Sequence, residues 1–117
     1  MIKSKYKGET LVTEYANPPL DVGVEYRTTE QFNGLPVFAK SFEVTMSNGG
    51  TISVDGAYKI IRTQGFVQSR GTLPIIYADL NNAYAAWLFA ESGKITMKCG
   101  TSVAGKTAWI TAYYTKS

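Results

Sequence analysis

Two tyrosines enclose a short polar segment in the second half of this 117-residue chain, which reads YADLNNAY over residues 77–84. Aromatic rings such as those of Tyr77 and Tyr84 stack against the C–H groups of sugars. The side chains between them, Asp79, Asn81 and Asn82, can form paired hydrogen bonds with hydroxyl groups. The segment therefore predicts a binding loop suited to a glycan. An ordinary polar loop, whose tyrosines pack at strand ends, has the same composition.

Other side chains could contribute to a site of this kind. Trp87 follows the segment closely and is a weaker candidate ligand contact. Both Trp87 and Trp109 are also typical of a core or of a contact between subunits. Arg62 and Arg70 could face an acidic glycan, although arginines on strands are commonly just solvated.

Groups for catalysis are sparse. The chain has no histidine, which excludes histidine-based triads and histidine metal ligands. The 9 acidic residues are dispersed and share no motif, although two of them could still meet in space as a glycosidase pair. The glycine-containing loop over residues 100–106 lacks the spacing of a phosphate-binding loop. We therefore expect no catalytic residue, no metal site and no cofactor.

Charge and cysteine content limit the partners. Three lysines lie in the first seven residues, and the rest of the chain balances nine basic against nine acidic side chains. Because no basic cluster is visible, we expect no nucleic-acid partner. Cys99 is the only cysteine, so an intrachain disulfide is excluded, and we expect a buried thiol. No signal peptide or long apolar run is visible, so we expect no membrane insertion.

Short alternating runs between 11 glycines and 4 prolines predict an all-β fold. About seven to nine strands at turn spacings of about eight to twelve residues are typical of an antiparallel β-sandwich, here jelly-roll-like. A small barrel is the alternative architecture. We expect one domain over residues 9–117, preceded by a tail or linker over residues 1–8.

The longest predicted strand covers residues 35–46, after a tight turn at Asn33-Gly34 that tolerates positive φ. Its alternation predicts one apolar face, made of Phe38, Phe42, Val44 and Met46, and an opposite face made of Val37, Ala39, Ser41, Glu43 and Thr45. Lys40 falls on the apolar face, which a bulge or a snorkelling stem would explain.

Further strands are predicted downstream. Gly65 is expected to form a bulge or bend in a strand over residues 58–70. Residues 73–77 predict a short strand or a crossing, and residues 84–91 predict a strand with Trp87 and Phe89 on one face. Residues 94–99 alternate cleanly, with Ile95, Met97 and Cys99 inward.

Two stretches carry a more specific pattern. Thr29-Glu30 precedes a strand opening that reads NGLPVFAKSF over residues 33–42, and the chain ends WITAYYTKS over residues 109–117. In this order, the two stretches resemble the opening and closing strands of the C-terminal domain of phage tail-fibre and baseplate-tip proteins. Residues 51–106 resemble that family in layout more than in identity. Leu35 departs from the polar residue that usually follows the glycine.

The resemblance implies a non-catalytic tip domain that recognises a glycan or another receptor on the host cell surface. It also implies a homotrimer that ends an upstream fibre shaft in the virion, assembled in the host cytoplasm. The aromatic content of 13% is consistent with an interface between subunits. The alternatives are a structural trimerisation cap, a tailspike domain that degrades polysaccharide, and a bacterial adhesin module of similar architecture.

Overall fold

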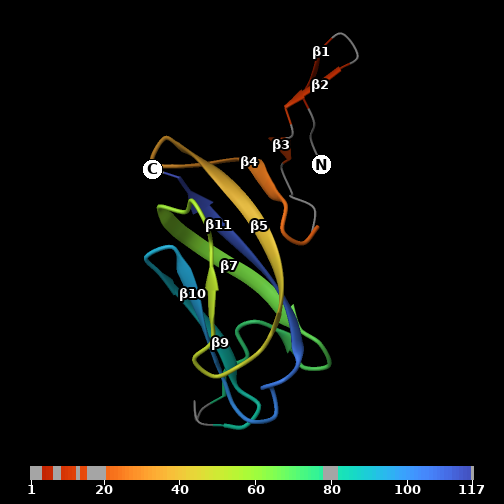
Figure 1. Ribbon diagram of the computed structural model, residues 1–117, viewed down its shortest axis with the longest axis vertical. Helices are drawn as coiled ribbons and strands as arrows, with labels where there is room; N and C mark the ends of the chain where they lie inside the picture. The colour runs from red at the N-terminus through yellow and green to blue at the C-terminus, as the bar shows by residue number, and fades with distance from the viewer. Residues whose placement is uncertain (1–3, 7–8, 13, 16–20, 78–81, 117) are drawn as a thin grey trace.

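The computed structural model describes residues 4–6, 9–12, 14–15, 21–77 and 82–116, and these residues form β-strands joined by turns and loops (Figure 1). The strands are β1 Ser4–Tyr6, β2 Glu9–Val12, β3 Glu14–Tyr15, β4 Glu25–Phe32, β5 Leu35–Thr45, β6 Thr51–Ser53, β7 Lys59–Val67, β8 Gly71–Thr72, β9 Ala86–Glu91, β10 Lys94–Cys99 and β11 Thr107–Thr115. No helix occurs in this part of the chain, so the predicted all-β class is confirmed.

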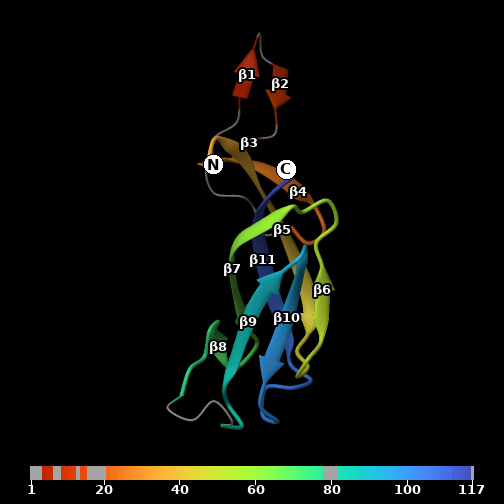
Figure 2. The same ribbon diagram turned by 90° about the vertical axis from the view of Figure 1, so that its left-hand side faces the viewer.

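The strands form a large sheet in the order β3-β4-β5-β11-β7-β8 and a small sheet in the order β6-β10-β9, while β1 pairs with β2. Pairing is antiparallel throughout, except between β3 and β4. Figure 2 shows the small sheet lying across the large one, with β9 and β10 in front of β11. Both sheets are therefore antiparallel in the main, as predicted.

One hydrophobic core lies between the two sheets. Its buried residues include Met46, Val67, Ala108, Ile110, Ala112 and Tyr114 on the side of the large sheet, Ile52, Ala86, Ile95, Met97 and Cys99 on the side of the small sheet, and Val54 and Val103 from the loops. Phe38, Phe42 and Val44 pack against this core from β5. The predicted inward faces of residues 35–46 and 94–99 are therefore confirmed, because alternation fixes which side chains share a face.

The alternation of residues 35–46 predicted a strand buried on one face, and over the first half of β5 this prediction is wrong because the opposite face is buried too. Val37 and Ala39 are fully buried there, in a second cluster with Tyr113 that Phe32 and Ile61 flank. The reason is that the larger side chains of neighbouring strands pack against the small ones of β5. The alternation within one strand contains no information about its neighbours.

The turn at Asn33-Gly34 is present, with φ of 50° and 78°. Lys40 causes no bulge: it pairs regularly with Ala112, and its Nζ lies 5.7 Å from the centre of the Phe42 ring. The stem thus follows the apolar face while the ammonium group reaches outward, which is the snorkelling alternative.

The structure refines two predictions for the second half. Gly65 forms no bulge, because it pairs regularly with Ile110, and the irregularity of β7 falls instead opposite Tyr113 and Tyr114. Residues 73–77 form no strand beyond a single bridge between Ile75 and Ala86, so the segment is a crossing.

Candidate ligand-binding site

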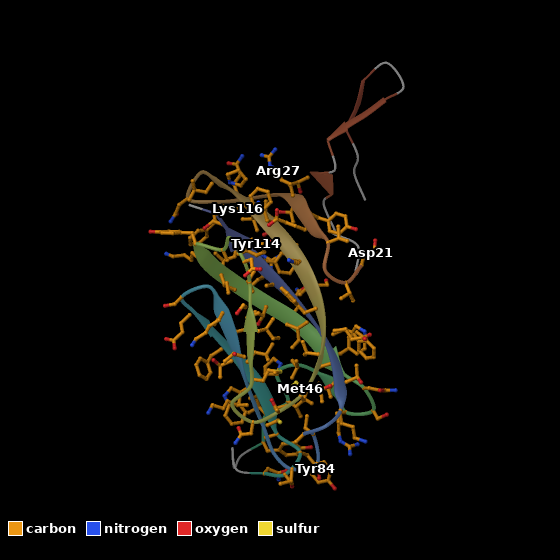
Figure 3. The ribbon with its side chains drawn as sticks, viewed as in Figure 1. Asp21, Arg27, Met46, Tyr84, Tyr114 and Lys116 are labelled. Atoms are coloured by element: carbon orange, nitrogen blue, oxygen red, sulfur yellow. The ribbon has the colours of Figure 1, made fainter. Side chains whose placement is uncertain are left out.

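The segment after residue 81 lies at one end of the molecule. In Figure 3, Tyr84 is at this end, whereas Tyr114 and Lys116 of the C-terminal strand region lie toward the opposite end. Four backbone segments meet here, because residues 82–87 contact the turn over residues 99–105, and Arg70 and Asn48 approach from two other loops.

Backbone hydrogen bonds fix residues 82–85 against the neighbouring turn. The N–H of Gly100 donates to the carbonyl of Ala85 at 2.9 Å, and the N–H of Ser102 donates to the carbonyl of Ala83 at 2.9 Å. Gly100 is required at the crossing, because a Cβ there would lie 2.5 Å from the carbonyl oxygen of Ala83. These bonds hold the backbone of the segment in place, so that little backbone ordering is needed when a ligand binds.

The two predicted tyrosines are accessible. Tyr77 is 43% exposed and Tyr84 is 49% exposed, and the guanidinium of Arg70 lies 5.7 Å from the centre of the Tyr84 ring. Arg70 is itself positioned by a 3.0 Å hydrogen bond from its Nε to the carbonyl of Ser102. Arg70 thus holds a cation beside the ring at a cation–π distance.

The predicted polar residues divide into two groups. Asp79 and Asn81 lie outside the described residues. The side-chain oxygen of Asn82 accepts a 2.9 Å hydrogen bond from the backbone N–H of Tyr84, an arrangement that closes an Asx turn. Asn82 therefore shapes the loop with its carbonyl group, and its amide nitrogen remains able to donate to a ligand.

Trp87 lines a cavity of about 350 Å³. The other lining residues are Asn48, Ala83, Cys99, Gly100, Thr101 and Ala104. The cavity thus combines an indole ring with an amide and a hydroxyl group, and Ala83 connects it to the loop that carries Tyr84. Burial raises the pKa of the Cys99 thiol, so this lining group is a neutral thiol rather than a nucleophilic thiolate.

The acidic side chains of the large sheet pair with different partners. Glu25 binds Tyr114 and Lys116, and Glu30 forms two hydrogen bonds with Arg62. The hydrogen bonds from Arg62 outweigh burial and lower the pKa of Glu30. Among the described residues, no group of three or more His, Cys, Asp or Glu side chains is arranged to hold a metal ion.

A group of residues on the outer face of the large sheet was missed by sequence reasoning. The rings of Phe66 and Trp109 stack there with centroids 5.0 Å apart at 25°, and the Trp109 Nε1–H donates to Glu43 at 2.9 Å. Trp109 therefore lies outside the core, and a contact between subunits, the other place expected for it, stays a prediction. Alternation alone places Trp109 and Thr111 on one face of the last strand, but the alignment of Phe66 with Trp109 depends on a pairing register between distant segments.

No model of a protein family matches this chain, and no curated protein or solved structure shows significant similarity to it. The two stretches that resemble fibre-tip domains form β5 and β11, which are neighbours at the centre of the large sheet. No helix in the described residues is long and apolar enough to span a membrane.

Proposed function

We propose that this chain is the C-terminal tip domain of a phage tail-fibre or baseplate protein, and that it recognises a host-surface glycan without catalysis. The sequence motifs of β5 and β11 support the family, as does the all-β architecture. We further propose that the two sheets form a β-sandwich of jelly-roll type, and that three copies assemble into a homotrimer at the end of a fibre shaft in the virion.

The cavity beside Trp87 is the observation that carries the binding function. It places one indole ring, one amide and one hydroxyl group within a space of about 350 Å³, and its lining residue Ala83 directly precedes the exposed Tyr84 in the chain. Small-ligand sites typically occupy about 300–1,000 Å³ and combine aromatic walls with a few polar groups. A sugar can stack on the ring while its hydroxyls bind Asn48 and Thr101.

The placement of this end supports a tip domain. Tyr84 lies far from β4 and from the last residues of β11 (Figure 3). In a fibre whose shaft joins the domain ahead of β4, the cavity therefore points away from the shaft and toward the host. A purely structural cap requires neither a cavity nor exposed aromatic rings at that end.

The arrangement of acids supports binding without hydrolysis. A glycosidase needs two carboxyl groups about 5–10 Å apart on either side of the scissile bond. Glu25, Glu30 and Glu43 are each bound to a different group that is not a carboxylate. Among the described residues, no acidic side chain lines the cavity that contains Trp87 and Asn48.

Adsorption to whole host cells tests the proposal. We expect the variant Tyr84→Ala, Trp87→Ala to lose most adsorption, while Tyr58→Ala binds like the wild type. Tyr58 is a matched control, because it is 68% exposed and lies beside Thr115 at the opposite end. Asn82 is left unchanged because its side chain maintains the turn. Isolated sites are expected to bind at about millimolar Kd, with strong adsorption arising from three linked copies.

Two outcomes would contradict the proposal. Equal adsorption of the double variant and the wild type, with the same fold and oligomeric state, would favour the structural cap. Release of reducing sugars from host polysaccharide by the wild type would favour the tailspike enzyme.

A further inference from the structure

We infer that the outer face of the large sheet holds a second binding site, for one neutral sugar ring. A cavity of about 190 Å³ lies on this face and is lined by Ser41, Gln64, Gly65, Phe66, Trp109 and Thr111. These residues come from the central strands β5, β11 and β7, and none of them lines the cavity beside Trp87. The inference goes beyond the proposed function, because it assigns a ligand to a different surface.

The aromatic part of the site is preorganised. The rings of Phe66 and Trp109 are stacked, and the hydrogen bond to Glu43 holds the indole in one orientation. Phe66 remains 41% exposed, so the pair presents apolar ring surface to solvent. An exposed aromatic pair held in place by a side-chain hydrogen bond offers a flat surface to the C–H face of a pyranose at low entropic cost.

The buried hydroxyl pair supplies a hydrogen-bond donor. Ser41 Oγ and Thr111 Oγ1 lie 2.7 Å apart, and the two residues are only 4% and 6% exposed. Each hydroxyl carries one hydrogen, and a single bond between them uses one of the two. Both residues line the cavity, and no other side-chain hydrogen bond of either is found among the described residues. One nearly buried O–H is therefore left to donate either to water or to a ligand in the cavity.

Gln64 adds further donors at a fixed position. Its Oε1 accepts a 3.1 Å hydrogen bond from the Tyr113 hydroxyl. Because this bond sets the orientation of the amide, the NH₂ group with its two donors is directed elsewhere. In the described part of the chain no group pairs with that NH₂. A sugar hydroxyl both donates and accepts hydrogen bonds. It can therefore accept from these donors and donate to the Glu43 carboxylate.

The charges around the cavity favour an uncharged ligand. Arg62 is a cation on the same face, and it is bound at both ends of its guanidinium to Glu30, at 2.7 Å and 2.5 Å. Its guanidinium also lies over the Tyr113 ring at 3.9 Å. Glu43 is the charged group next to the aromatic pair, and it would repel a carboxylate or sulfate. The volume of about 190 Å³ is below that of sites for drug-sized ligands, so one ring fits and the remaining glycan lies outside.

The two tryptophans of the chain provide a direct test, since each marks one of the two sites. The protein, labelled with ¹⁵N, is titrated with methyl β-glucoside, methyl β-galactoside and N-acetylglucosamine, and the two indole N–H signals are followed by NMR. The Trp109→Phe variant assigns them. We expect the Trp109 signal to shift and saturate with at least one of these sugars, and glucuronate to bind at least tenfold more weakly than glucose.

A matched pair of phenylalanine variants controls for indirect effects. Phe66 and Phe89 are exposed to similar extents, 41% and 43%, but Phe89 lies on the small sheet. We expect Phe66→Ala to weaken binding at Trp109 at least tenfold and Phe89→Ala to leave it unchanged. Because both side chains are partly exposed, both variants should fold, which the dispersion of their spectra checks.

Three results would overturn the inference. The first is that none of the three sugars shifts the Trp109 indole signal. The second is that a sugar shifts the Trp109 signal equally in Phe66→Ala and in the wild type. The third is a Trp109 signal shielded from a soluble paramagnetic agent in the sugar-free protein, which would show that a second copy of the chain covers this face. A shift of Trp87 alone would support the proposed function and reject the second site, so the two hypotheses fail separately.

Discussion

Glu25 connects the beginning of β4 to the end of β11. Its carboxylate accepts hydrogen bonds from the Tyr114 hydroxyl and from Lys116 Nζ, the latter at 2.6 Å. Burial by itself would raise the pKa of Glu25, but the hydrogen bonds from Lys116 and Tyr114 outweigh it, so the pKa is lowered. The same carboxylate, together with burial, raises the pKa of Tyr114. At neutral pH this pair therefore consists of a carboxylate and a protonated phenol.

The lowered pKa of Glu25 predicts a pH-dependent contribution to stability. A carboxyl group with a lower pKa in the folded state stabilises the fold above its unfolded pKa of about 4, and this stabilisation is lost as pH falls through the folded pKa. We expect Glu25→Gln to cost about 0.2–1 kcal/mol at neutral pH, because the group is partly exposed. The cost should vanish in strong acid.

Thermal melts of wild type and Glu25→Gln across the acidic range measure this difference. Glu91→Gln is the control, because Glu91 is exposed and forms no ion pair within the described residues. A difference between wild type and Glu25→Gln that stayed constant down to strong acid would show that the carboxylate charge has no part in the stabilisation.

Phe42 tests the assignment of the faces of β5. It packs against the core between the sheets and pairs with Ile110, which is fully buried. We expect Phe42→Ala to cost about 3 kcal/mol, at the lower end of the range for phenylalanine truncation because the ring is only partly buried. That loss lowers Tm by more than about 10 °C in a domain of this size.

Calorimetry on Phe42→Ala, with Phe89→Ala as the exposed control, gives the comparison. The control should melt within about 2 °C of the wild type, since surface substitutions usually change stability by less than about 0.5 kcal/mol. Similar melting of the two variants would be inconsistent with a core role for Phe42.

At the scale of elements, two glycines allow close approaches that shape the two sites. Gly65 lets β7 lie against β11, since a Cβ would overlap the carbonyl oxygen of Trp109 and lie 3.1 Å from the Cα of Ile110. Gly100 lets the 99–105 turn cross residues 82–85. In each case the obstacle is backbone, which cannot rotate away as a flexible side chain can.

We expect Gly100→Ala and Gly65→Ala to destabilise the protein by similar amounts, about 1–3 kcal/mol, but to alter different sites. Gly100→Ala should displace residues 82–85, shift the Trp87 indole signal and reduce adsorption to cells. Gly65→Ala should shift the Trp109 signal instead. The measurement is a two-dimensional NMR spectrum of each variant, compared with the wild type.

The two variants are controls for each other. If each glycine variant moved the Trp87 and Trp109 indole signals by equal amounts, the two sites would be coupled through the core. The separation of the sites into independent elements would then be wrong.

At the scale of the whole molecule, apolar side chains remain on the surface. Val22, Val24 and Ile76 are 45% to 59% exposed. Exposed apolar residues that are contiguous mark interfaces. A short edge strand such as β8 is protected when another chain covers it. These features are consistent with the homotrimer that we propose.

Light scattering on the purified protein tests the oligomeric state. The expected mass is about three times the chain mass of 12.8 kDa. Because a fibre shaft can contribute to trimer stability, the measurement is repeated with a trimeric coiled coil fused ahead of β4. A monomer in both forms would contradict the homotrimer and leave each binding site to act alone.

The sequence by itself determined the all-β class, the Asn33-Gly34 turn and the inward faces of residues 35–46 and 94–99. These features depend on local physics, because the period of two and the tolerance of asparagine and glycine for positive φ are properties of a few consecutive residues.

Only the tertiary structure decided which faces meet. It placed Phe66 beside Trp109, buried Ala39 beneath larger neighbours, and used Asn82 to close a turn. The physical reason is that strand register and sheet packing are set by pairings between segments far apart in the chain, and a shift by one residue would move every side chain to the other face. The outer-face site therefore exists only in the folded protein, since its residues are spread from Ser41 to Thr111 along the chain.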